Sequence, residues 1–200
     1  IPETSELLPI RALGKCGGAL SDIEEAIRWA AGLPVPGAPA NPYPAQVINL
    51  SLGGDGVCGA TMQAAVTAAI NAGAVVVAAT GNGSDVNTIS PANCTGAIGV
   101  TAHTINGENA DYANIGPGTA LSAPGGGSPI LLGRGGPTDG ADFDGRYIFS
   151  TVLFGATSPT SLAASSTDSG PAYAGFVGTS AAAPQVAGVA ALLKSSASSA

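Results

Sequence analysis

The sequence predicts an α/β fold in which helices cover both faces of a mainly parallel, doubly wound sheet, giving three layers. Apolar runs typical of buried strands alternate with helical patterns along the chain, and Gly and Pro gather between these runs. The 200 residues are 45% hydrophobic and only 10% charged, which provides ample material for a core. We therefore expect residues 1–200 to form a single domain.

The first elements are expected within the first 32 residues. Leu7 to Leu13 is an apolar run that predicts a buried strand. Ser21 and Glu24 have the spacing of a capping box, which predicts a helix that continues to about Ala31 and stops at Gly32.

The remaining elements follow the same alternation. A strand begins at Val47, a helix covers residues 61–72 and stops at Gly73, and a buried strand covers residues 74–79. A further strand is expected over residues 97–101, and shorter strand candidates are residues 121–123 and 147–151.

Charge and hydropathy exclude two classes of partner. The formal net charge is −7 with six basic residues, so there is no basic stripe to neutralise the phosphates of a nucleic acid or of anionic lipid. No apolar run approaches the roughly 20 residues that cross a bilayer. The sequence starts at Ile1 with no signal peptide, which is typical of a processed or excised piece.

Three cysteines occur without the spacing of a zinc site. Cys58 follows one predicted strand and Cys94 follows the next, and neighbouring parallel strands place such loops at the same edge of a sheet. We therefore predict a disulfide between Cys58 and Cys94. Cys16 is then left for a partner on another segment, while three reduced, buried thiols are the alternative.

The stretch from Gly178 to Gly188 places Ser180 at the start of an alanine-rich helical pattern. Backbone N–H groups at a helix N-terminus favour developing negative charge, which suits a nucleophile that forms an oxyanion. An ordinary helix cap at Thr179 or Ser180 is the alternative.

The same stretch resembles the serine signature of the subtilases, the subtilisin-like serine proteases of peptidase family S8. It has Gly-Thr-Ser, small residues, Pro184 and an apolar run that ends in Ala-Gly. It departs from the commonest form of the motif at Ala181, where Met is usual, and at Gln185, where His is usual. Neither is a catalytic position, so the resemblance implies that Ser180 is the nucleophile of an acyl-enzyme mechanism.

Two further stretches resemble other parts of the subtilase site. Residues 75–83 resemble the oxyanion-hole segment, which implies that the Asn82 carboxamide and the Ser180 N–H hold the oxyanion. A turn-forming Asn between glycines is the alternative. Residues 47–54 resemble the strand that pairs with an extended substrate. The implied substrate-binding residues are Ser51, Leu52, Gly53, Gly54, Ala79, Thr80 and Gly81.

A serine nucleophile needs an adjacent base and an orienting third group. His103 is the single histidine, and its surroundings resemble an exposed turn of subtilases, so we do not assign it as the base. Asp168 stands in an Asp-Ser-Gly run, but too close to Ser180 in sequence for the subtilase aspartate. The resemblance therefore implies a subtilisin-like catalytic domain that is incomplete at both ends and lacks its Asp and His segments.

Two other patterns concern cofactors. Residues 54–59 form a G-x-G-x-x-G string, but no acidic residue ends the following strand, so we expect no dinucleotide or other organic cofactor. Asp139, Asp142 and Asp144 supply closely spaced oxygen ligands, which makes them candidates for a structural calcium site or simply a solvated loop.

Together these patterns predict a secreted serine endopeptidase. A segment absent from this chain would supply the catalytic His and Asp, as an N-terminal fragment of the same enzyme that is disulfide-linked through Cys16 or as residues of the same polypeptide. The alternative is a catalytically silent module of the same fold that binds peptides or has a structural role.

Overall fold

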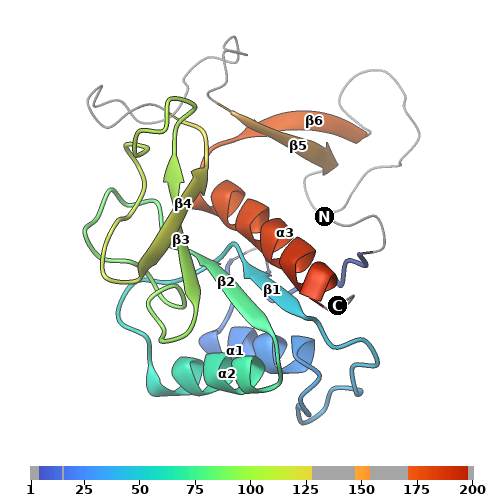
Figure 1. Cartoon of the computed structure of the whole chain (residues 1–200). Coiled ribbons are helices and arrows are strands. Elements are labelled where there is room, and N and C mark those ends of the chain that lie inside the picture. Colours follow the sequence, from blue (N-terminus) through green and yellow to red (C-terminus); the bar gives the residue numbers. More distant parts are fainter. Residues whose placement is uncertain (1–4, 15, 128–146, 154–170, 198–200) are drawn as a thin grey trace.

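The computed structural model describes residues 5–14, 16–127, 147–153 and 171–197. A four-stranded parallel sheet lies at its centre, in the order β1 (Val47–Leu50), β2 (Val75–Ala79), β3 (Ile98–His103) and β4 (Thr119–Pro124). Helices α1 (Leu20–Ala30) and α2 (Ala60–Asn71) cover one face, and α3 (Thr179–Ala197) crosses the other (Figure 1). The three-layer, mainly parallel α/β fold is therefore confirmed.

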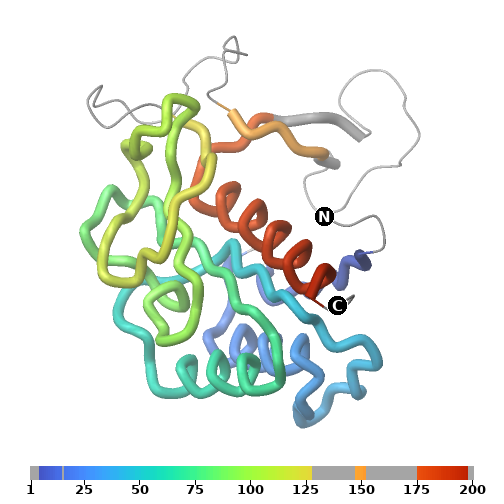
Figure 2. The backbone as a smooth tube through the Cα atoms, in the orientation of Figure 1, coloured from blue at the N-terminus to red at the C-terminus, as the bar shows by residue number. Residues whose placement is uncertain are grey.

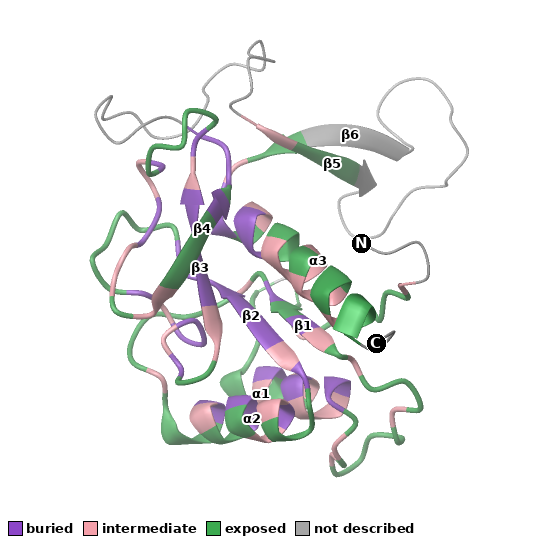
Figure 3. Cartoon of the chain, viewed as in Figure 1, coloured by how far each residue is buried: buried purple, intermediate pink, exposed green. Residues whose placement is uncertain are grey.

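Strand β2 shows why this chain forms three layers. Its side chains alternate between the faces, so Val76 packs with the cluster under α1 and α2, whereas Val77 packs with the cluster under α3. Both side chains are almost completely buried. Figure 3 shows the buried residues concentrated in β2, β3 and the helix faces turned to them. A strand that is apolar on both faces requires a cover on both sides.

The expected helices form, but α1 begins differently. Its N-cap is Ala19, which makes no side-chain capping bond, and Ser21 lies inside the helix, so the predicted capping box is wrong. The carboxylate of Glu24 instead accepts a hydrogen bond from the Thr61 hydroxyl at 2.7 Å. Gly32 follows the helix with φ +78°, the left-handed conformation that ends a helix.

The predicted strand at residues 7–13 is wrong. These residues form no strand, and Leu7 is 79% exposed while Ile10 is 38% exposed. An apolar run becomes a strand only when another strand edge pairs with it, and this segment has no such partner within the described residues. Figure 2 shows that the start of the described chain lies near the C-terminal end of α3.

A second, two-stranded sheet consists of β5 (Ile148–Leu153) and β6 (Pro171–Phe176), which pair antiparallel. The predictions at residues 121–123 and 147–151 correspond to β4 and β5, while β6 was not predicted. No helix in the described part of the chain combines the length and apolar character needed to cross a membrane.

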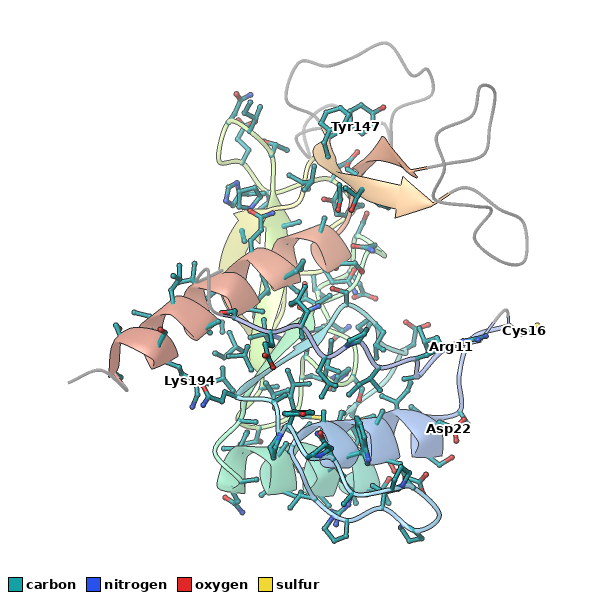
Figure 4. All side chains as sticks on the ribbon, turned by 90° about the vertical axis from the view of Figure 1, so that its right-hand side faces the viewer. Arg11, Cys16, Asp22, Tyr147 and Lys194 are labelled. Atoms are coloured by element: carbon teal, nitrogen blue, oxygen red, sulfur yellow. A yellow bond between two sulfur atoms is a disulfide. The ribbon has the colours of Figure 1, made fainter. Side chains whose placement is uncertain are left out.

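Cys58 and Cys94 form the predicted disulfide, with their Cα atoms 5.1 Å apart. The bond joins the loop after β1 to the loop after β2, so the reasoning from neighbouring parallel strands is confirmed. Residues 54–59, the G-x-G-x-x-G string, lie in this cross-linked loop. Cys16 is a free and exposed cysteine, and Figure 4 shows it projecting from the body of the molecule.

Candidate active site

The candidate site lies where the carboxyl ends of β1 and β2 meet the N-terminus of α3. The strands are parallel neighbours, with Leu50 in register with Ala78, so the residues that follow them emerge at the same edge. Helix α3 contacts both strands, and Ser180 is its second residue. Three segments that are distant in sequence therefore meet around one exposed serine.

Ser180 and Ser51 exchange two hydrogen bonds. The Ser180 hydroxyl donates to the Ser51 carbonyl at 3.3 Å, and the Ser51 hydroxyl donates to the Ser180 carbonyl at 2.8 Å. The Ser180 carbonyl is available to accept this second bond because its usual helical donor would be the N–H of residue 184, and Pro184 has none. Asn49 Nδ2 also donates to Ser51 Oγ at 3.0 Å. This network fixes the backbone of the nucleophile candidate relative to β1.

The Asn82 carboxamide is oriented by the residue before Ser180. Its Oδ1 accepts the Thr179 N–H and the Thr179 hydroxyl, each at 2.9 Å. Because a backbone N–H only donates, the acceptor must be Oδ1, which assigns the amide orientation. Asn82 Nδ2 makes no hydrogen bond within the described residues and is free to donate to an anion. Thr179 is completely buried whereas Asn82 is exposed, so the pairing fixes one end of a carboxamide that faces solvent.

The segment Ser51–Gly54 follows β1 and is not part of it, which refines the prediction of a substrate strand. Its far end is held because Gly54 exchanges backbone bonds with Ser90, at 2.9 and 3.0 Å. The backbone of Leu52 and Gly53 makes no hydrogen bond within the described residues. An extended peptide can therefore pair with it, as in strand addition.

Gly53 allows this segment to lie close to the loop after β2. A Cβ at this position would lie 2.5 Å from Ile89 Cδ1 and 2.6 Å from the Ser90 carbonyl oxygen, whereas a Cβ on Gly54 meets nothing within 4 Å. Only glycine fits at position 53 without displacing its neighbours.

Ala79, Thr80 and Gly81 form a rigid second wall. All three are buried, and the Thr80 hydroxyl donates to the Asn114 carbonyl at 2.9 Å. The Asn114 side chain accepts the N–H groups of Gly83 and Asp85, at 2.7 and 3.1 Å. Sequence reasoning missed Asn114, which bonds Thr80 before Asn82 and both Gly83 and Asp85 after it, from 29 to 34 positions away.

Tyr112 is the other residue that sequence reasoning missed. Its hydroxyl accepts the N–H of Gly178, two residues before Ser180, at 3.1 Å. Burial raises the pKa of Tyr112 to about 12, and the nearby Asp111 carboxylate acts in the same direction, so the phenol stays protonated at neutral pH. An isolated Tyr has no sequence signal that indicates this contact.

His103 lies elsewhere than expected. It is the last residue of β3 and is half-buried, so the prediction of an exposed turn is wrong. Its Nδ1 donates to the Thr104 carbonyl at 2.8 Å, which leaves Nε2 without a proton in the neutral ring. Within the described residues, no hydrogen bond joins this ring to Ser180.

Four aspartates considered in the sequence analysis lie outside the described residues. These are Asp139, Asp142 and Asp144, the calcium candidates, and Asp168. Among the residues that are described, no three His, Cys, Asp or Glu side chains gather as metal ligands would.

The fold and the site define a parallel α/β protein with a serine-centred site at the carboxyl edge of its sheet. Residues 2–200 match the model of the subtilase family, Peptidase_S8, so the chain belongs to this family. The subtilisin-like fold expected from the motifs is thereby confirmed.

Relatives and solved structures agree with this assignment. The chain is 44% identical to an "Extracellular protease" of Xanthomonas campestris pv. campestris, over 96% of this chain and 28% of that protein. It is 36% identical to an "Extracellular basic protease" of Dichelobacter nodosus, over 98% of this chain and 28% of that protein. A solved protease structure from Pseudoalteromonas arctica superposes with a TM-score of 0.80 at 42% identity, covering 94% of this chain and 50% of that one. The chain thus spans half or less of these proteins.

Proposed function

We propose that this chain carries the nucleophile and oxyanion hole of a secreted serine endopeptidase. The observation that carries the proposal is the placement of Ser180 at the N-terminus of α3, beside a carboxamide that Thr179 orients. In the proposed reaction, Ser180 Oγ attacks the peptide carbonyl and forms an acyl-enzyme that water then hydrolyses. Asn82 Nδ2 and the Ser180 N–H donate to the oxyanion of each tetrahedral intermediate.

The proposed substrate is an extended peptide. The open backbone of Leu52 and Gly53 would pair with it, and Gly54 and the buried wall of Ala79, Thr80 and Gly81 would border the primary side-chain pocket. The names of the relatives, extracellular proteases in two bacteria, support both proteolysis and secretion.

We further propose that residues outside this chain supply the base and its orienting carboxylate. Ser180 donates to a backbone carbonyl, and the single histidine is engaged with Thr104, so no described group is positioned to remove the Ser180 proton. Strand β1 has no strand partner on one side within the described part of the chain, and Leu7 and Ile10 expose apolar side chains that further polypeptide would cover. If the segment is a separate fragment, the exposed thiol of Cys16 is the position for a disulfide to it.

A structural calcium ion at Asp139, Asp142 and Asp144 stays a prediction from ligand type. The second candidate function, a catalytically silent peptide-binding or structural module, is favoured by one observation: the single histidine makes no hydrogen bond to Ser180.

Hydrolysis assays on the whole protein that contains this chain separate the two functions. The unmodified protein should cleave an unfolded protein substrate at internal bonds, and Ser180→Ala should lower kcat by at least about a thousandfold while peptide binding persists. A matched Ser21→Ala variant, at an exposed position of helix α1, which covers the sheet face opposite α3, should retain activity. Peptide binding without cleavage by the unmodified protein would support the silent module instead.

A further inference from the structure

We propose that Tyr112 is a positioning residue that fixes the turn before Ser180 and thereby the oxyanion donors. This inference rests on the proposed function, because its consequence for catalysis requires Ser180 to act. Tyr112 lies 68 positions before Ser180 and belongs to the loop between β3 and β4, so the two meet only in the folded chain.

The Tyr112 hydroxyl connects three backbone groups. It lies 2.8 Å from the Gly125 carbonyl oxygen and 2.9 Å from that of Gly126, and donates its single proton between them. It accepts the Gly178 N–H at 3.1 Å, and this N–H also donates to the Gly125 carbonyl at 2.9 Å. The loop after β4 and the turn that starts α3 are therefore joined by one direct backbone bond and by the Tyr112 hydroxyl, which contacts both segments.

The glycine loop after β4 is shaped around the Tyr112 ring. A Cβ on Gly125 would lie 2.7 Å from Tyr112 Oη, and a Cβ on Gly127 would lie 2.6 Å from Tyr112 Cε1. Gly127 also has φ +94°, which other residues rarely adopt. The ring packs with the apolar cluster under α3, so its position is fixed by packing as well as by hydrogen bonds.

The backbone of Tyr112 contacts the other half of the oxyanion site. Its carbonyl accepts the Ser84 N–H at 2.8 Å, two residues after Asn82. One residue thus holds the loop that carries the Asn82 carboxamide through its backbone and the turn that carries the Ser180 N–H through its side chain. Oxyanion donors stabilise a transition state only when they are held in place before reaction, which is the contribution we assign to Tyr112.

The test compares Tyr112→Phe with Tyr43→Phe in the whole protein. Phe retains the ring and removes only the hydroxyl, and Tyr43 is an exposed tyrosine whose hydroxyl makes no hydrogen bond within the described residues. For Tyr112→Phe we expect kcat to fall about three- to tenfold, with KM within about twofold of the unmodified protein. Tyr43→Phe should change neither.

Hydrogen exchange provides a readout that does not depend on activity. In Tyr112→Phe, amide exchange in the peptide that contains Gly178 should accelerate about three- to tenfold, while exchange in β2 stays unchanged. Unchanged exchange at Gly178, or a loss in KM with kcat unchanged, would overturn the proposal. If the unmodified protein does not cleave peptides, the proposed function fails, while exchange at Gly178 still decides whether Tyr112 holds the turn.

Discussion

Within the described residues, strand β1 pairs with another strand along one edge, here called the paired side, and with none along the other, here called the open side. Toward β2, all four residues of β1 are in register with a parallel partner, and Ile48 and Leu50 are buried. On the opposite side no strand pairs with β1 within the described residues. The N-terminal run that contains Leu7 and Ile10 also exposes apolar side chains. The paired side holds the nucleophile and its donors in place, whereas the proposed base belongs to the open side.

Of the changes on the paired side, removal of the Asn82 donor is expected to lower activity most. Asn82→Leu should lower kcat of the whole protein about 10²- to 10³-fold, the scale already known for removal of this type of donor in subtilisin and adopted here. KM should change little, because the donor acts on the oxyanion and not on bound substrate. Steady-state kinetics with a peptide substrate provide the measurement.

The matched control for that variant is Asn106→Leu, at an exposed turn position that is remote from the hydrogen bonds of Ser180. If Asn82→Leu retained more than a third of the original kcat, Asn82 would have no role as an oxyanion donor.

Removal of the disulfide tests how firmly the loops on the paired side are held. The Cys58→Ser, Cys94→Ser double variant should lose about 2–4 kcal/mol of unfolding free energy, because the bond closes a loop of 36 residues. Denaturant unfolding under oxidising conditions measures this loss. Val57→Ser, at an exposed position beside Cys58, should leave the free energy of unfolding unchanged, and an equal loss in both variants would contradict a structural role specific to the disulfide.

Leu7 tests whether further polypeptide covers the exposed N-terminal run in the whole protein. If further polypeptide packs there, Leu7→Ser should cost about 1–3 kcal/mol of unfolding free energy, since a buried leucine side chain contributes that much. Val57→Ser provides the control, because Val57 is 88% exposed in a loop. Equal and negligible losses for the two variants in denaturant unfolding would show that the Leu7 side chain stays in solvent.

Gly53 tests the shape of the substrate segment with the smallest expected effect. Gly53→Ala places a methyl group against Ile89 and Ser90, so kcat/KM should fall about tenfold as the segment shifts. Gly59→Ala, at the N-cap of α2 with φ −67° and nothing within 4 Å of its Cβ, should retain activity within about twofold. Similar losses of kcat/KM in both variants would indicate that both positions need the backbone flexibility of glycine and not the space that a missing side chain leaves.

The success of sequence reasoning depended on how local each feature is. Ser180, Asn82 and Ser51 stand in short strings, and the alternation of strands and helices implied that their loops share one edge. The Cys58–Cys94 bond was predictable for the same reason. The strand at residues 7–13 was wrong because pairing depends on a neighbour that an apolar run does not specify.

Features that depend on distant contacts left no sequence signal. Tyr112 and Asn114 act through hydrogen bonds to Gly178 and Gly83, which are 66 and 31 positions away. Ser21 has the spacing of a capping box, but α1 begins one residue earlier, at Leu20, so the motif lies inside the helix. Such contacts are decided by packing after the elements have formed, and not by local preference.

The most direct test of the central claim is covalent labelling of the whole protein with a fluorophosphonate, followed by peptide mass spectrometry. We predict a single adduct on Ser180, which forms in the unmodified protein, slows strongly in Asn82→Leu and is absent in Ser180→Ala. Folded, complete protein that gains no adduct, or an adduct on another serine, would contradict the assignment of Ser180 as the nucleophile.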